Sequence, residues 1–182
     1  IKNKGYASVR YSSHINVNET LSEVAKRNSY ILRLCSLVNS FIGPNVVNKG
    51  NVIMLTFTYN NENLPFAINP DTNERVPVFS RNHVKTFLNR LKVRHSRFMK
   101  GFYRYFICFE YGKNTKRQHL HGLFCLSPEC DLRKFVDTCR ELWCYGYMFP
   151  SPHGNPYEDA KLRHGGKGAS YAAKYVCKDL SY

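Results

Sequence analysis

Several features that would assign a chain to a familiar class are missing here. The sequence has no run of about 18 apolar residues, the length that a membrane-spanning helix needs. Residues 165–168 are rich in glycine but lack the G-x-x-x-x-G-K-[ST] spacing of a nucleotide-phosphate loop. The seven cysteines are an odd number and contain no tight C-x-x-C pair, which disfavours zinc. We therefore expect reduced thiols, no membrane partner and no nucleotide-triphosphate site.

Acidic residues are also scarce. The 182 residues include 27 Lys and Arg but only 13 Asp and Glu, so the formal net charge is +14. Such an excess favours a polyanion as partner, with a membrane surface as the competing interpretation. Because the apolar patches are only as long as strands, we expect DNA or RNA rather than lipid.

The length and the hydrophobic fraction of 43% predict one domain over residues 1–182. Within it, residues 1–50 form a helical extension and residues 51–182 form the catalytic core. Helical periodicity and strand composition predict the following elements: helices over residues 16–41, 82–98, 131–142 and 169–178, strands over 52–59, 102–111, 118–126 and 145–149, a long loop over 60–80 with room for a small hairpin, and a loop over 150–168.

This order contains a βαββαβ kernel, which predicts an α+β fold of the ferredoxin-like, split βαβ type. Its sheet is antiparallel, with helices packed on one face. The strands over 102–111 and 118–126 are then neighbours. The second face of the sheet is left for a metal ion and a nucleic-acid strand.

The most informative cluster is Glu110 with His119 and His121. Residues i and i+2 of a strand point to the same face, so the two histidines project together. If the two strands pair as a hairpin, Glu110 reaches that face as well. Two imidazoles and a carboxylate suit a divalent cation with open coordination positions. A cation would also offset the cost of a carboxylate in an apolar strand.

Two tyrosines follow in the predicted C-terminal helix. Tyr171 and Tyr175 are four residues apart and share a helix face. Lys174 and Lys178 each follow a tyrosine by three positions, and a nearby lysine favours the phenolate and attracts phosphate. Paired aromatics at this spacing are usually core, but the neighbouring alanines, valine and cysteine can supply the packing. We therefore predict a phenol nucleophile for phosphodiester attack.

Candidate DNA contacts lie in two basic segments. Lys113, Lys116 and Arg117 occupy the expected turn between the two site strands, and Lys167 precedes the tyrosine helix. A basic turn is often only solvated, but beside the candidate metal ligands it can contact phosphates.

Together these motifs resemble the HUH superfamily of rolling-circle replication initiators. The histidine-hydrophobe-histidine motif is His119-Leu120-His121, and the bacteriophage branch has the Y-x-x-x-Y-x-x-K pattern seen in residues 171–178. Three further segments are similar to initiators of microviruses of the gokushovirus type: residues 55–59, 109–112 and 142–147. The resemblance covers residues 52–178, with all five motifs in the family's order.

The resemblance implies an HUH endonuclease fold and a single-strand-specific DNA nickase and ligase. Glu110, His119 and His121 would hold Mg²⁺ or Mn²⁺. A tyrosine would form a 5′-phosphotyrosine bond at a replication origin and leave a 3′-OH for the host polymerase, with a host helicase as a further partner. The location would be the cytoplasm of a bacterial host.

Two other classes stay open at this point. Two histidines and a carboxylate also describe a non-haem iron site, although the charge and the tyrosines do not fit it. A non-catalytic single-stranded nucleic-acid-binding module on the same fold explains the charge but not the three candidate ligands.

Overall fold

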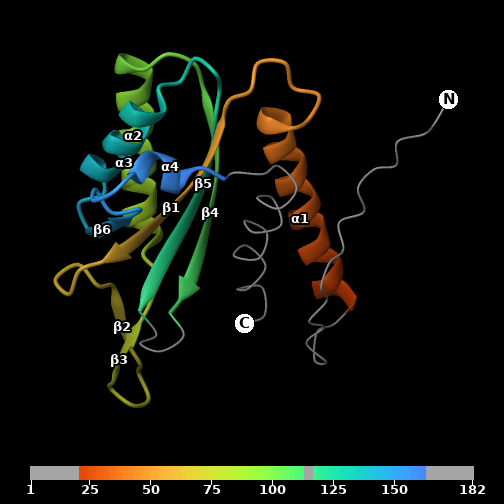
Figure 1. The fold of residues 1–182 in the computed structure, drawn as a ribbon. Coiled ribbons are helices and arrows are strands. Elements are labelled where there is room, and N and C mark those ends of the chain that lie inside the picture. The colour runs from red at the N-terminus through yellow and green to blue at the C-terminus, as the bar shows by residue number, and fades with distance from the viewer. Residues whose placement is uncertain (1–20, 113–116, 163–182) are drawn as a thin grey trace.

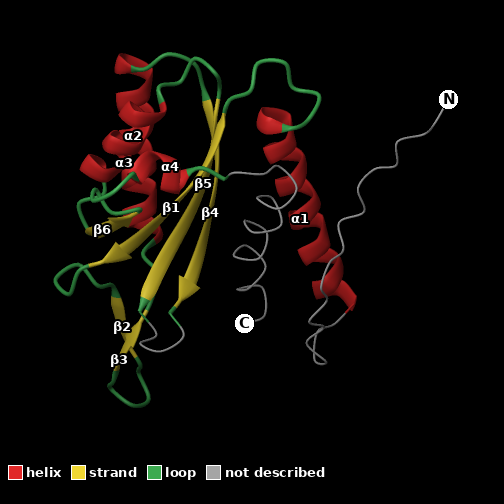
Figure 2. Ribbon diagram, in the orientation of Figure 1, coloured by secondary structure: helices red, strands yellow, loops and turns green. Residues whose placement is uncertain are grey.

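The computed structural model describes residues 21–112 and 117–162. Figure 1 traces the chain and Figure 2 distinguishes helices from strands. The elements in chain order are α1 (Leu21–Ile42), β1 (Asn51–Tyr59), β2 (Phe66–Ile68), β3 (Arg75–Pro77), α2 (Arg81–Phe98), β4 (Tyr103–Tyr111), β5 (Gln118–Leu126), α3 (Leu132–Leu142), β6 (Gly146–Phe149) and α4 (Pro156–Ala160).

The main sheet has the strand order β4-β5-β1-β6, and each neighbouring pair is antiparallel. Helix α2 connects β1 to β4, a tight connection joins β4 to β5, and α3 leads to β6. This is the predicted α+β, ferredoxin-like arrangement, and it is confirmed. The strands that carry Glu110 and the two histidines are neighbours, as expected.

One face of the sheet packs against α2 and α3. Alternate residues of β1 point into this layer, and Ile53, Leu55 and Phe57 are at most 1% exposed. They belong to the same core as Leu91 of α2 and Phe135 of α3. Because β1 lies between β5 and β6, its side chains are shielded on both flanks, which accounts for its apolar sequence.

Helix α1 packs against the opposite face of the sheet, as Figure 1 shows. Leu34 and Val38 of the helix meet Val52, Leu123 and Cys125 of the strands in a second apolar cluster. The one-face prediction thus holds for the helices of the βαββαβ kernel, while the N-terminal extension covers one end of the second face. The rest of that face, where the strands run beyond the helix, carries the candidate ligands.

The predicted loop over residues 60–80 contains the small hairpin β2–β3, which projects beyond the sheet (Figure 1). Its base is fastened by Gln118, which is fully buried at the start of β5. The Gln118 amide donates to the backbone carbonyls of Pro65 and Val78, at 2.8 Å each. One side chain therefore holds both ends of the hairpin against the sheet.

The loop expected over residues 150–168 is wrong at one point, because it contains the short helix α4. Asn155 caps this helix, Pro156 begins it, and Glu158 lies in its first turn. These are ordinary helix-start signals. The helix has only five residues, too few for a periodic pattern.

In the described part of the chain, no helix is long and apolar enough to cross a membrane. The cysteines there are free thiols, as expected: Cys35, Cys108, Cys125, Cys130, Cys139 and Cys144.

Candidate functional site

The candidate site lies where β4, β5 and β1 run side by side. Glu110 is directly opposite His119 across the β4–β5 pair, so both side chains share a face. His121 is two residues further along β5 and lies on the same face. On its other side, β5 pairs with β1, which places Thr58 opposite His119 and Thr56 opposite His121. The register therefore gathers the three candidate ligands and two threonines on one face.

His121 is held from both ends of its ring. Its Nε2 lies 2.8 Å from Oε2 of Glu110, and its Nδ1 lies 2.9 Å from the hydroxyl of Thr56. The side chains of His121 and Glu110 are only 10% and 12% exposed. An ionised carboxylate can only accept, so Nε2 carries the hydrogen in this pair. The Thr56 hydroxyl can either donate or accept, and therefore suits both protonation states of Nδ1.

His119 is directed toward the end of β4. Its Nε2 would lie 3.0 Å from a Cβ atom at Gly112, so the ring rests close against the glycine backbone. Burial lowers the pKa of His119, and His121 and Arg117 lower it further, while Glu110 opposes them. A neutral imidazole is the form that binds metal ions. The environment of His119 therefore favours the ligand form.

Among residues 21–112 and 117–162, no group of three His, Cys, Asp or Glu side chains has the spacing of a formed metal site. The cause is visible in the contacts, because Glu110 bonds His121 directly while His119 turns toward Gly112. The donor set itself fits a divalent cation: a carboxylate and two imidazoles share one face of adjacent strands. The residues thus fit Mg²⁺ or Mn²⁺ in chemistry and register, after a change of side-chain rotamers.

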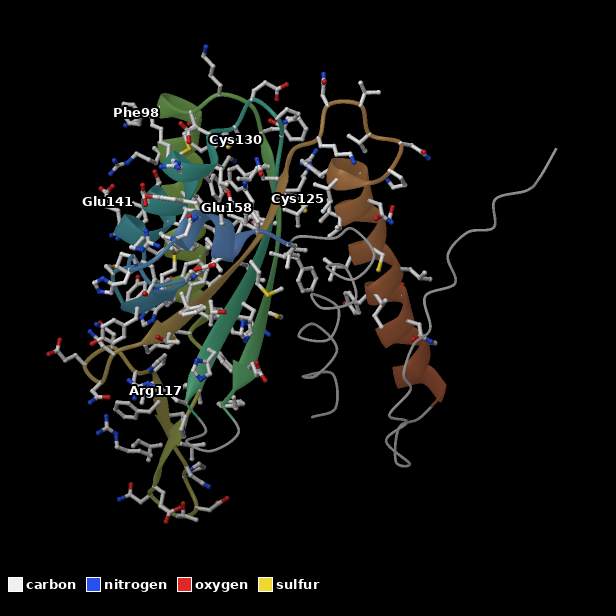
Figure 3. The ribbon with its side chains drawn as sticks, viewed as in Figure 1. Phe98, Arg117, Cys125, Cys130, Glu141 and Glu158 are labelled. Carbon is white, nitrogen blue, oxygen red and sulfur yellow. The ribbon has the colours of Figure 1, made fainter. Side chains whose placement is uncertain are left out.

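Arg117 is engaged with the protein. Its guanidinium donates to the carbonyl of Tyr59, at 3.1 Å and 2.6 Å, and to the side chain of Asn61. It thereby ties the start of β5, labelled by Arg117 in Figure 3, to the end of β1. A contact between Arg117 and DNA stays a prediction.

The other candidate residues lie outside the described residues: Lys113, Lys116, Lys167, Tyr171, Lys174, Tyr175 and Lys178. The structure therefore shows the predicted carboxylate and histidines together, but does not place the predicted nucleophiles.

Sequence reasoning missed the two threonines of β1. The signal was present, since Thr56 and Thr58 alternate with the buried residues Leu55, Phe57 and Tyr59. Polar residues at every second position of a central strand indicate a face with a special environment. The pattern alone could not say that Thr56 would bond His121, because that contact joins segments 65 positions apart.

The comparisons with known proteins agree with this geometry at the level of the family. A model of the replication-associated protein ORF2 family matches residues 52–180, which include the three candidate ligands. The search of curated proteins and the search of solved structures found no match. Because the family model covers well over half of the sequence, the chain belongs to this family of replication-associated proteins.

Proposed function

We propose that this protein is a metal-dependent nickase and ligase of single-stranded DNA that initiates rolling-circle replication. Its family supports a role in replication initiation. The observation that carries the finer proposal is the register that places Glu110, His119 and His121 on one face of adjacent strands. The HUH superfamily, as found in microviruses, combines such a face with tyrosine nucleophiles.

Glu110, His119 and His121 would hold Mg²⁺ or Mn²⁺, which supplies Lewis-acid polarisation of a phosphate oxygen when bound. The chain's own contribution is orientation. Thr56 fixes the ring of His121 from the side opposite Glu110, and partners of this kind set the direction and basicity of a ligating histidine.

The nucleophile would be Tyr171 or Tyr175. The last described residue, Leu162, packs in the apolar cluster on the same face of the sheet as the histidines, and its N–H donates to Val52 of β1. Tyr171 follows Leu162 by nine positions, and such a length of chain can reach about 30 Å. The position of Leu162 is thus compatible with a tyrosine at the site.

In the proposed step, the phenol oxygen attacks the phosphorus atom in line. A bond from phosphorus to the tyrosine forms, the bond to the 3′ oxygen breaks, and the released 3′ oxygen takes up a proton. Lys174 and Lys178 would favour the phenolate. The reverse attack by a 3′-OH joins the strand and needs no nucleotide cofactor, since the energy of the phosphodiester is kept. Host polymerase and helicase would then extend the strand in the bacterial cytoplasm.

A nicking assay on circular single-stranded DNA, with and without Mn²⁺, tests this proposal. We expect a covalent protein–DNA adduct in the wild type, and none in the double variant Tyr171→Phe, Tyr175→Phe, which should still bind DNA. Either single variant should keep some cleavage, because the other phenol is available. An adduct formed by the double variant would overturn the mechanism, and peptide mapping of the wild-type adduct identifies the residue used.

A non-catalytic single-stranded nucleic-acid-binding module is the second candidate. It is favoured by the direct bond between Glu110 and His121, because that pair satisfies both side chains without a metal. This candidate predicts DNA binding with no adduct under any metal condition.

DNA binding by either route should weaken as salt rises, because phosphate contacts release counterions. Replacing a phosphate-contacting lysine should reduce the salt slope by about one. The variants to compare are Lys113→Ala, Lys116→Ala and Lys167→Ala. A salt slope that is the same in all of them as in the wild type would exclude these side chains as phosphate contacts.

A further inference from the structure

The outer strand of the candidate face carries two bare aromatic rings. Tyr147 and Phe149 of β6 are 71% and 64% exposed, the two most exposed aromatic side chains among the described residues. The water-facing side of an antiparallel sheet ordinarily carries polar residues. Within the described part of the chain, neither ring has an aromatic partner, whereas Met148 between them is buried in the core.

The register places these rings beside the candidate ligands. Tyr147 is opposite Thr58, which is opposite His119, and Phe149 is opposite Thr56, which is opposite His121. The strands therefore present two parallel rows that run from aromatic to threonine to histidine. Strands are about 4.8 Å apart, so each ring starts about 10 Å from its histidine.

Strand β6 is anchored firmly enough to hold the rings in place. Its N-terminal end approaches β1 so closely that a side chain at Gly146 would collide with the Thr58 carbonyl. Just beyond its C-terminal end, Arg140 of α3 donates to the carbonyl of Pro150 at 3.1 Å. Trp143, which precedes the strand, donates to the carbonyl of Thr58 at 3.1 Å. The exposed rings thus stand on a strand held at both ends, which reduces the entropy lost on binding.

We infer that Tyr147 and Phe149 form a base-stacking platform for unpaired nucleotides that flank the scissile phosphate. The inference rests on the proposed single-stranded DNA substrate and names the residues that bind its bases. Aromatic rings stack on any base, so the platform confers preference for unpaired bases rather than for a sequence. A gap of about 10 Å corresponds to about three nucleotides at a rise of about 3.4 Å. The platform would therefore hold bases up to about three positions from the site.

The charge of the chain selects nucleic acid over a protein partner as the occupant. With a net charge of +14, the protein attracts a polyanion, and a second copy of the chain would be repelled. A duplex is disfavoured because its bases are already stacked on one another.

The test compares two probes of equal charge: an oligonucleotide of about 12 thymidines, and a strand of the same length made of abasic spacers. Binding is measured by fluorescence anisotropy without divalent metal, so that cleavage plays no part. We expect the wild type to bind the thymidine strand at least about tenfold more tightly than the abasic strand. The double variant Tyr147→Ala, Phe149→Ala should lose most of this preference while its affinity for the abasic strand stays unchanged.

Two controls make the result specific. The variant Tyr147→Phe, Phe149→Tyr keeps both rings and should keep the preference. Phe98→Ala removes a ring that is 58% exposed at the end of α2, far from the candidate face, and should change nothing (Figure 3).

Three outcomes would overturn the inference: no preference for bases in the wild type, an undiminished preference in the double alanine variant, or an equal loss of affinity for both probes. Loss of a wild-type dimer in the alanine variant, with base preference intact, would assign the rings to a protein interface instead. If nicking fails but the preference depends on the rings, the platform stands and only the catalytic proposal falls.

Discussion

Replacing Thr56 with valine tests how His121 is positioned. Valine has nearly the same shape but removes the hydroxyl that lies 2.9 Å from Nδ1 of His121. A buried polar atom left without its partner costs about 1–3 kcal/mol. Because Thr56 is only half-buried, we take about 1–2 kcal/mol, which corresponds to a factor of about 5–30. This overlaps the loss seen when the outer partner of a metal-ligating histidine is removed.

The measurement is the affinity for Mn²⁺, followed by electron paramagnetic resonance of the free ion, together with the rate of nicking. Thr58→Val is the matched control, since it lies two residues further along the same strand and its hydroxyl bonds the Tyr147 carbonyl, at 3.4 Å, rather than a candidate ligand. Thr56→Ser keeps a hydroxyl and should recover most of the affinity. If Thr56→Val and Thr58→Val bind Mn²⁺ equally well, the hydroxyl does not position His121, and the reasoning is refuted.

Three further predictions concern the site, the hairpin and the core. His119→Ala or His121→Ala should abolish nicking while the circular dichroism spectrum stays native, and nicking at the wild-type rate by the double variant would exclude a metal role for both residues. Gln118→Leu leaves the carbonyls of Pro65 and Val78 without their donor, so limited proteolysis should cut within residues 60–80 faster than in the wild type; an unchanged cleavage pattern would contradict the clamp. Burial lowers the pKa of His95 below 6.5, so the unfolded state takes up a proton first as the pH falls, and the free energy of unfolding should decrease by at most about 1.4 kcal/mol per pH unit below about 6.5. Urea unfolding of His95→Gln should show a flatter pH dependence, and an identical slope would refute this assignment.

Much of the fold could be predicted from local sequence. The buried strand β1, the amphipathic helices α2 and α3 and the hairpin strands β4 and β5 each carry a strong periodic pattern, and their bounds agree with the prediction to within one residue. The order of these elements then leaves few ways to form a sheet. The short helix α4 was missed, because five residues give too little periodicity to separate it from a loop.

The position of α1 could not be predicted in the same way. Its apolar residues at Leu34 and Val38 indicate that one side is buried, but not against which face of the sheet. Both faces of the central strands carry apolar residues at that end, and only the packing of Val52 and Leu123 decides the matter. The consequence is functional, since α1 limits the open part of the candidate face.

The sequence by itself determined which residues share a face: the spacing of His119 and His121 and the hairpin with Glu110 require only the alternation of a strand. Only the tertiary structure decided what each of these side chains contacts. Thr56 and Glu110 reach His121 from two neighbouring strands, while the ring of His119 lies against Gly112. Tyr147 and Phe149 join the same face because β6 pairs with the far side of β1. Such contacts depend on strand order and register, which are set by burial of the whole sheet and not by any local segment.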